Sequence, residues 1–138
     1  KAYGLAGLRV GYGVSNPVIA DLLNRVRQPF NVNIPAIVAA TAALHDEAYL
    51  QQSCAMNARG LSQLKSGFFA LGLEFIPSVG NFITVDFGKD ASGIDKALLQ
   101  KGVIVRPVAN YNMPTCLRVS IGLPEENERL LVSLKESI

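Results

Sequence analysis

A glycine-rich segment, Lys1–Tyr12, carries the residues best suited to chemistry. It supplies a primary amine at Lys1, glycines that permit tight turns, and an arginine at Arg9, eight positions further on, where a strand would begin. Arginine offers planar, paired donors to a phosphate, and a desolvated lysine beside other cations is a nucleophile. From the residues alone, the segment indicates either an anion pocket beside a nucleophilic amine, or a surface lysine, a tight turn and a solvated arginine.

A second segment, Cys116–Gly122, has the alternation of a strand. Its inward-facing residues would be Leu117, Val119 and Ile121. Arg118 and Ser120 would then occupy the opposite face. Arg106 precedes Pro107 at the end of another expected strand. From the residues alone, Arg118 fits a buried ion pair or a surface position, and Arg106 fits simple exposure at the end of a strand.

The elements around the first segment are expected to be a strand and two helices. Alternation over residues 8–14 predicts the strand. Asn16 can cap a helix from Pro17 to Val26, and Asn33 can cap a much longer one. Apolar residues at three- and four-residue spacing continue that second helix to Gly72, with a break near Asp46 as an open alternative. A helix of that length would bridge two domains.

Beyond Gly72 the period becomes that of strands. The expected strands are 74–77, 81–87, 103–106 and 117–121. Ser92 and Asp95 resemble a capping box for a helix that ends at Gly102. A final amphipathic helix from Pro124 would bury Leu130, Leu131, Leu134 and Ile138. This order predicts an α+β fold in which helices cover a largely antiparallel sheet.

Composition excludes several classes of protein. The net charge of +2 over 138 residues, with Arg25 and Arg27 as the nearest thing to a basic cluster, predicts neither a nucleic-acid nor a membrane partner. A single histidine, His45, predicts no metal site, and two cysteines predict reduced thiols in a soluble cytoplasmic protein. Because the first residue is Lys1 and not methionine, we expect a fragment or a processed product.

The start of the chain resembles the pyridoxal-phosphate lysine signature of class II aminotransferases, in the fold-type I superfamily. The shared spacing is lysine, two residues, glycine, two residues, glycine, one residue, arginine, one residue, glycine. With the segments 28–33, 77–82 and 116–122, the whole chain resembles the carboxy-terminal portion of the histidinol-phosphate aminotransferase family. The resemblance implies a remnant of the large cofactor-binding domain with a strand and a helix (1–33), a long interdomain helix (34–72) and the small α+β domain (73–138).

The resemblance also implies roles for four residues. Lys1 matches the catalytic lysine that holds pyridoxal 5'-phosphate through its amine and then moves a proton at the substrate α-carbon. Arg9 matches the arginine that binds the cofactor phosphate. Arg118 matches the arginine that grips the substrate carboxylate, and Arg106 matches a second one for the distal anionic group.

The implied reaction is transfer of an amino group between histidinol phosphate and the 2-oxo acid 2-oxoglutarate, in histidine biosynthesis, by a homodimer. Alternatives within the class are an aromatic or phenylalanine aminotransferase and threonine-phosphate decarboxylase. From another class, the chain as it stands could be a non-catalytic α+β module, because the family's partner for the cofactor's ring nitrogen lies in an amino-terminal half that this chain lacks. We therefore expect the activity in the parent protein and inactivity in the chain alone.

Overall fold

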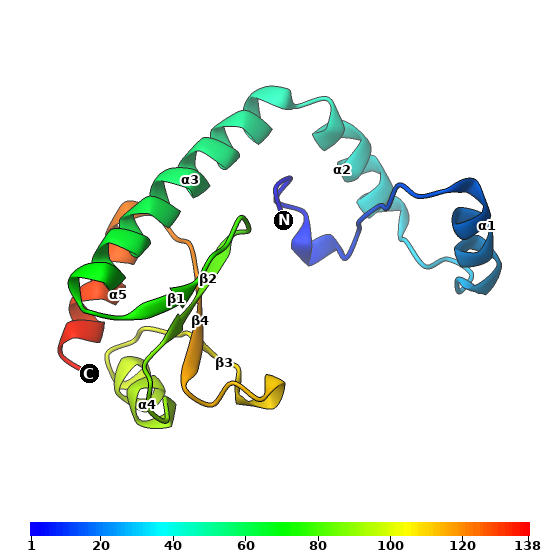
Figure 1. Ribbon diagram of the computed structural model, residues 1–138. Helices are drawn as coiled ribbons and strands as arrows, with labels where there is room; N and C mark the ends of the chain where they lie inside the picture. Colours follow the sequence, from blue (N-terminus) through cyan, green and yellow to red (C-terminus); the bar gives the residue numbers. More distant parts are fainter. The chain divides into compact units, whose positions relative to one another are not determined.

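Helices make up most of residues 1–54, the first of two units into which the chain divides; the second is residues 55–138. The computed structural model describes all residues from 1 to 138 (Figure 1). The first unit contains η1 (Ala6–Leu8), α1 (Pro17–Val26), α2 (Ile34–Leu44) and the beginning of α3 (Glu47–Ala70). The boundary between the units falls within α3. The division of the chain at residues 33 and 72 stays a prediction.

Side-chain caps set where the first helices begin. The Asn16 side chain accepts a hydrogen bond from the backbone N–H of Val18 at 2.9 Å. Asn33 accepts one from Ala36 at 2.8 Å. Each bond satisfies a backbone donor that the first helical turn leaves without a partner. Both predicted caps are confirmed.

The chain breaks between α2 and α3 at the position that the sequence left open. The Asp46 carboxylate accepts a hydrogen bond from the backbone N–H of Tyr49 at 2.9 Å, which is an amino-terminal cap for α3. The helix ends at Ala70, and Gly72 closes its last turn with φ +69°. The N–H of Leu73 donates to the carbonyl of Phe68 in that turn. That geometry is the glycine-dependent helix end that the sequence predicts.

The predicted strand over residues 8–14 is wrong. Residues 6–8 form a 3₁₀ turn, Arg9 follows in the left-handed region at φ 54°, and residues 10–14 form no strand. A strand needs a neighbour for its backbone groups, and every strand of the chain lies between residues 74 and 120. Residues 8–14 therefore have no strand to form backbone hydrogen bonds with, despite their alternating pattern.

The second unit is a four-stranded sheet with helices on one face. The strands are β1 (Glu74–Ile76), β2 (Phe82–Asp86), β3 (Arg106–Pro107) and β4 (Cys116–Ser120), in the order β1-β2-β4-β3, and every pairing is antiparallel. Its helices are the part of α3 from residue 55 onward, α4 (Ser92–Gln100) and α5 (Pro124–Lys135), with the 3₁₀ turn η2 (Ala109–Tyr111) between β3 and β4. The predicted α+β class is confirmed.

The core lies between the sheet and its helices. From the sheet come Ile83, Val85, Leu117 and Val119, and from the helices Leu64, Phe68, Ile94, Leu98, Leu130 and Leu134. Figure 1 shows α3 and α5 side by side against the sheet. The opposite face of the sheet carries Phe82, Thr84, Arg106 and Arg118, as the registers require.

Three local expectations fail in this unit. The Ser92 capping box is wrong: α4 begins at Ser92, and the Asp90 carboxylate accepts from the Ser92 N–H at 3.0 Å. The strand expected over 103–106 is only Arg106–Pro107, because Val103 still bonds to the carbonyl of Leu98 in the closing turn of α4. Ile138 is exposed, because α5 ends at Lys135 and the chain leaves its apolar face.

Two glycines let α3 approach the end of β4 and α5. A Cβ atom on Gly60 would lie 2.6 Å from Cγ2 of Ile121 and 3.2 Å from the backbone oxygen of Gly122, and one on Gly67 would overlap the side chain of Leu131. The buried Asn127 amide fastens the same junction. It accepts from the N–H of Gly122 at 3.0 Å and donates to the Gly122 carbonyl and to Gln63, both at 3.1 Å.

Gly60→Ala is therefore expected to destabilise the chain by about 1–3 kcal/mol, because the new methyl group overpacks the junction. Gly93→Ala is the matched control: Gly93 lies in α4 with nothing within 4 Å of its missing Cβ, so alanine should leave stability unchanged or raise it by up to about 1 kcal/mol. Urea unfolding followed by circular dichroism measures both. Equal effects of the two substitutions would contradict the close approach at Gly60.

Candidate functional site

Two arginines lie opposite each other on the face of the sheet that the helices leave open. Arg106 of β3 pairs with Arg118 of β4, and Pro107 pairs with Leu117. Directly opposed residues of antiparallel strands have Cβ atoms about 5 Å apart on one face. Leu117 is buried and Arg118 half-buried, so the face predicted for Arg118 is confirmed. The structure thus brings together the two arginines that the sequence singles out.

Neither arginine of this pair has a carboxylate partner. An ion pair elsewhere in the unit joins Lys101 to Glu136, at 2.6 Å. Asp86 lies on the same sheet face, but its carboxylate accepts hydrogen bonds from the Gly88 N–H and from the Thr115 hydroxyl. These bonds lower its pKa, the one from Gly88 most. Two uncompensated cations on one face attract an anion.

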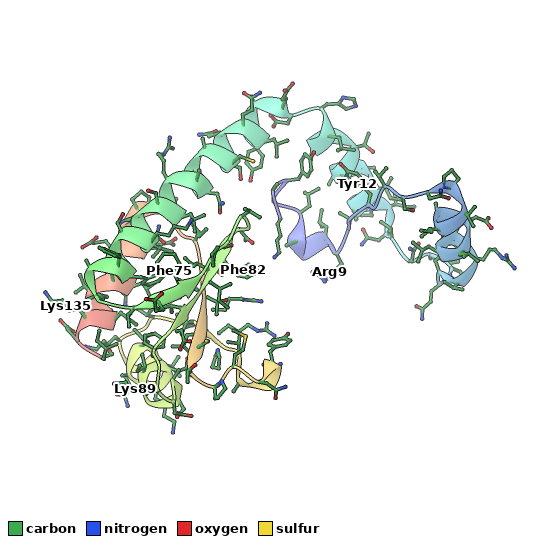
Figure 2. The ribbon with its side chains drawn as sticks, in the orientation of Figure 1. Arg9, Tyr12, Phe75, Phe82, Lys89 and Lys135 are labelled. Carbon is green, nitrogen blue, oxygen red and sulfur yellow. The ribbon has the colours of Figure 1, made fainter.

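Arg118 also contacts an aromatic ring. Its Cζ atom lies 4.8 Å from the centre of the Phe82 ring, within the range of a cation–π interaction. Phe82 begins β2, opposite Ser120, and is therefore a diagonal neighbour of Arg118 across the β2–β4 pair. Figure 2 labels Phe82 and Phe75, which belong to opposite faces of the sheet by the registers.

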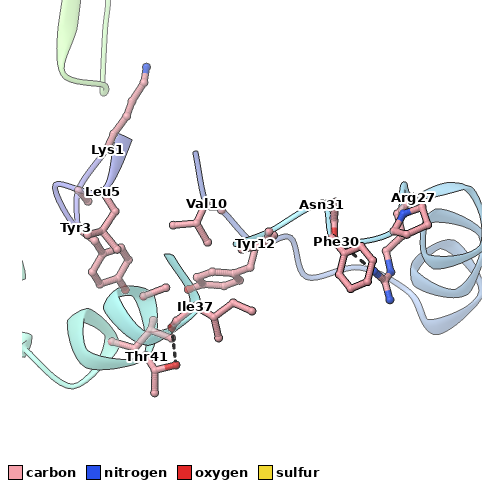
Figure 3. A pocket seen from close by; sticks show the side chains of 16 residues that line it. Lys1, Tyr3, Leu5, Val10, Tyr12, Arg27, Phe30, Asn31, Ile37 and Thr41 are labelled. Atoms are coloured by element: carbon pink, nitrogen blue, oxygen red, sulfur yellow. Dashed lines mark hydrogen bonds between the residues drawn. The ribbon is translucent and has the colours of Figure 1, made fainter. Parts of the chain in front are cut away.

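The first unit contains a groove of about 1030 Å³ with a lysine on its wall. Its lining is Lys1, Ala2, Tyr3, Leu5, Val10, Gly11, Tyr12, Arg27, Pro29, Phe30, Asn31, Val32, Ile37, Ala40, Thr41 and Leu44. Figure 3 shows the rings of Tyr3 and Tyr12 beside α2, with Arg27 hydrogen-bonded to Asn31, a distance of 3.3 Å. The groove is apolar along α2 and polar where the tyrosines, Lys1 and Arg27 border it.

The turn that carries Lys1 is held from both sides. The N–H of Gly4 donates to the Lys1 carbonyl at 2.9 Å, and Gly4 has φ +69°. A Cβ atom on Gly4 would lie 2.9 Å from the Tyr49 hydroxyl oxygen, so the turn sits directly against α3. Hydrogen bonding with Tyr12 raises the pKa of Tyr3, which keeps that phenol protonated.

Arg9 does not line the groove. Its Nη1 atom donates to the Ala6 carbonyl at 2.9 Å, and the residue is exposed in a left-handed conformation at the end of η1. The structure therefore brings Lys1 to the groove and leaves Arg9 beside it. The roles of Lys1, Arg9, Arg106 and Arg118 stay proposals.

Sequence reasoning missed Tyr3, Tyr12 and Phe82. The tyrosines stand inside the glycine-rich block, where an aromatic ring with a polar end is a signal for a binding surface. Phe82 is a large apolar residue on a face of β2 that is otherwise polar, which signals a partner other than the core. Arg27, which the sequence singles out only as a member of a weak basic cluster with Arg25, also borders the groove.

No group of three or more histidine, cysteine, aspartate or glutamate residues could hold a metal ion. Cys54 and Cys116 are free thiols. No helix of the structure is both long enough and apolar enough to span a membrane.

The chain belongs to the class I and II aminotransferase family, whose model matches residues 1–134. Among curated proteins, it is 63% identical to histidinol-phosphate aminotransferase 2 of Pseudomonas fluorescens over 136 residues, which are 99% of this chain and 37% of that protein. It is 64% identical to the protein of the same name from Pseudomonas aeruginosa over 134 residues, 97% of this chain and 36% of that protein. The chain thus spans little more than a third of these relatives' length.

Solved structures agree with this assignment. The chain matches histidinol-phosphate aminotransferase from Sinorhizobium meliloti in complex with pyridoxal-5'-phosphate with a TM-score of 0.85 and 35% identity, covering 99% of this chain and 38% of that one. The structure of a protein from Erwinia carotovora atroseptica, described as a putative histidinol-phosphate aminotransferase, matches with a TM-score of 0.88 and 26% identity, covering 99% of this chain and 39% of that one. The predicted fold, that of the carboxy-terminal part of fold-type I aminotransferases, is confirmed.

The arginine pair leads to a prediction about stability. Arg106→Gln should leave stability unchanged or raise it slightly at low ionic strength, because like charges opposite each other across two strands repel. Arg118→Gln relieves the same repulsion but loses the contact with Phe82, so it should lower the melting temperature. Lys89→Gln, an exposed change of the same charge outside the pair, is the control. Thermal unfolding at low and high salt tests this, and a melting temperature of Arg106→Gln that falls with that of Arg118→Gln would contradict it.

Proposed function

We propose that the whole protein catalyses transamination between histidinol phosphate and 2-oxoglutarate, a step of histidine biosynthesis. The observation that carries this proposal is 63% identity over 99% of the chain to a relative named histidinol-phosphate aminotransferase. Because the chain spans 37% of that relative's length, the activity is proposed for a protein of the relative's length.

The proposed cofactor is pyridoxal 5'-phosphate, and the residues present fit it. Lys1 is among the residues that line the groove of the first unit and offers a primary amine, and two tyrosines and an arginine line the same groove. Arg9 keeps donors beyond the one used on Ala6, and these suit a phosphate. When bound, the cofactor supplies an electron sink for charge that develops at the substrate α-carbon. A relative of 35% identity is described in complex with this cofactor.

The proposed substrates fit the arginine pair. Arg118 would bind the carboxylate next to the reacting carbon, with two parallel N–H donors, and Arg106 would bind the second anionic group of the amino donor or the 2-oxo acid. Lys1 would take a proton from the substrate α-carbon and deliver it to C4′ of the cofactor. One site that binds each substrate in turn needs cations that accept either a carboxylate or a phosphate, and arginines do so.

We also propose that the whole protein is a cytoplasmic homodimer. The free thiols of Cys54 and Cys116 suit a reducing compartment. Helix α1 exposes its apolar residues Val18, Ile19, Leu22, Leu23 and Val26, and such a continuous apolar face is typical of an interface. Mass measurement of the whole protein by light scattering tests the dimer, and a monomeric mass would remove it.

The first test of the activity is Lys1→Ala in the whole protein. We expect turnover of histidinol phosphate to be lost while the circular dichroism spectrum is unchanged, because the substitution removes the amine of an exposed residue. Lys1→Arg is the matched control, since it keeps the charge but cannot hold the cofactor covalently. Normal turnover in either variant would contradict the catalytic role proposed for Lys1.

The second test concerns Arg118. Arg118→Ala should raise the Michaelis constant for 2-oxoglutarate by about ten- to a hundredfold, the usual loss for a charge-assisted hydrogen-bond pair. Steady-state kinetics with each substrate varied in turn measure this effect. Unchanged Michaelis constants for both substrates would show that Arg118 does not bind a carboxylate.

A further inference from the structure

We propose that Phe82 is a positioning residue for Arg118: its ring holds the plane of the guanidinium group so that the paired N–H donors are presented to the substrate carboxylate. This inference rests on the carboxylate-binding role proposed above for Arg118. It adds to the site a residue without charge or polar atoms in its side chain.

The contact between the two side chains is direct. The Cζ atom of Arg118 lies 4.8 Å from the centre of the Phe82 ring. The negative face of an aromatic ring attracts a guanidinium cation. The N–H donors of that cation lie in its own plane, which leaves them able to bind a carboxylate while the ring contacts the carbon.

The sheet explains why Arg118 lies on the side of β2. Strand β4 has β2 on one side and β3 on the other, and Arg106 of β3 stands directly opposite Arg118. The positive charge of Arg106 repels Arg118, while the ring of Phe82 on β2 attracts it. No ion pair with a carboxylate competes with these two interactions, and both favour the side of β2.

The backbone at Phe82 is itself fixed by hydrogen bonds. The Ser78 hydroxyl donates to the Phe82 carbonyl at 2.5 Å and accepts from the N–H of Gly80 at 3.1 Å. The Asn57 amide of α3 donates to the Gly80 carbonyl at 3.1 Å. Ile83, the next residue, is fully buried in the core. The loop between β1 and β2 is thereby tied to α3, and the ring is supported by a rigid backbone.

Phe75 shows what a purely structural phenylalanine looks like in the same hairpin. It lies on the core face of β1, with its ring 6.3 Å from that of Phe68, and it packs against the core cluster. Phe82 is half-buried and is not part of that cluster. Phe75→Leu and Phe82→Leu remove the same atoms from opposite faces of the hairpin, so they form a matched pair.

The first arm of the test uses the chain 1–138 and needs no activity. In proton–nitrogen NMR spectra, the Arg118 Nε–H signal should be displaced by the ring current of Phe82. The displacement should disappear in Phe82→Leu and persist in Phe82→Tyr and Phe75→Leu. An Arg118 signal that does not respond to Phe82→Leu would overturn the inference, whatever reaction the whole protein catalyses.

The second arm uses the whole protein with 2-oxoglutarate. Phe82→Leu should raise the Michaelis constant about three- to tenfold with kcat changed by less than about twofold, Phe82→Tyr should restore it, and Phe75→Leu should lower the melting temperature alone. In an Arg118→Ala background, the effect of Phe82→Leu on the Michaelis constant should vanish. An effect that persists there, or an unchanged Michaelis constant in an active Phe82→Leu enzyme, would overturn the positioning role. Absence of transamination by the unsubstituted protein would overturn the proposed function instead.

Discussion

The second unit depends on the alternation of side chains along β4. Because neighbouring residues of a strand point to opposite faces, Leu117 and Val119 enter the core while Arg118, between them, must lie on the open face. A shift of pairing by one residue would exchange the two sets and bury the arginine. The buried leucine and valine therefore fix the position of the charged group as firmly as they fix the sheet, and the close approach of α3 at Gly60 and Gly67 secures the covered face.

Features encoded by neighbouring residues could be predicted from the sequence. Asn16 and Asn33 cap their helices, Gly72 ends α3 in a left-handed conformation, and alternation identifies β2 and β4. The failures are at positions where a distant partner decides. Residues 8–14 alternate but have no strand to pair with, and residues 103–106 lose most of their strand to the closing turn of α4. At Ser92, a competing carboxylate from Asp90 takes over the expected cap.

The candidate site divides in the same way. The face occupied by Arg118 follows from a local period of two residues, whereas its pairing with Arg106 depends on the register between β3 and β4, which no local pattern contains. From the sequence, Phe82 could be recognised only as an apolar residue on the polar face of β2. Its contact with Arg118 is seen only in the structure. The glycine and arginine spacing after Lys1 indicates the family directly, yet that Arg27 and the residues of α2 line the same groove as Lys1 is a meeting of segments that the spacing does not describe.

The sheet order β1-β2-β4-β3 has a consequence for biosynthesis. Strand β4 is internal in the sheet but is the last strand to be made, so on the ribosome β2 has an open edge until residues 116–120 emerge. The amide of Asn127 must then close a loop of 64 residues to reach Gln63. Until that happens the nascent chain presents an unpaired strand edge and the apolar side of α3, the two kinds of surface that promote aggregation and that chaperones cover.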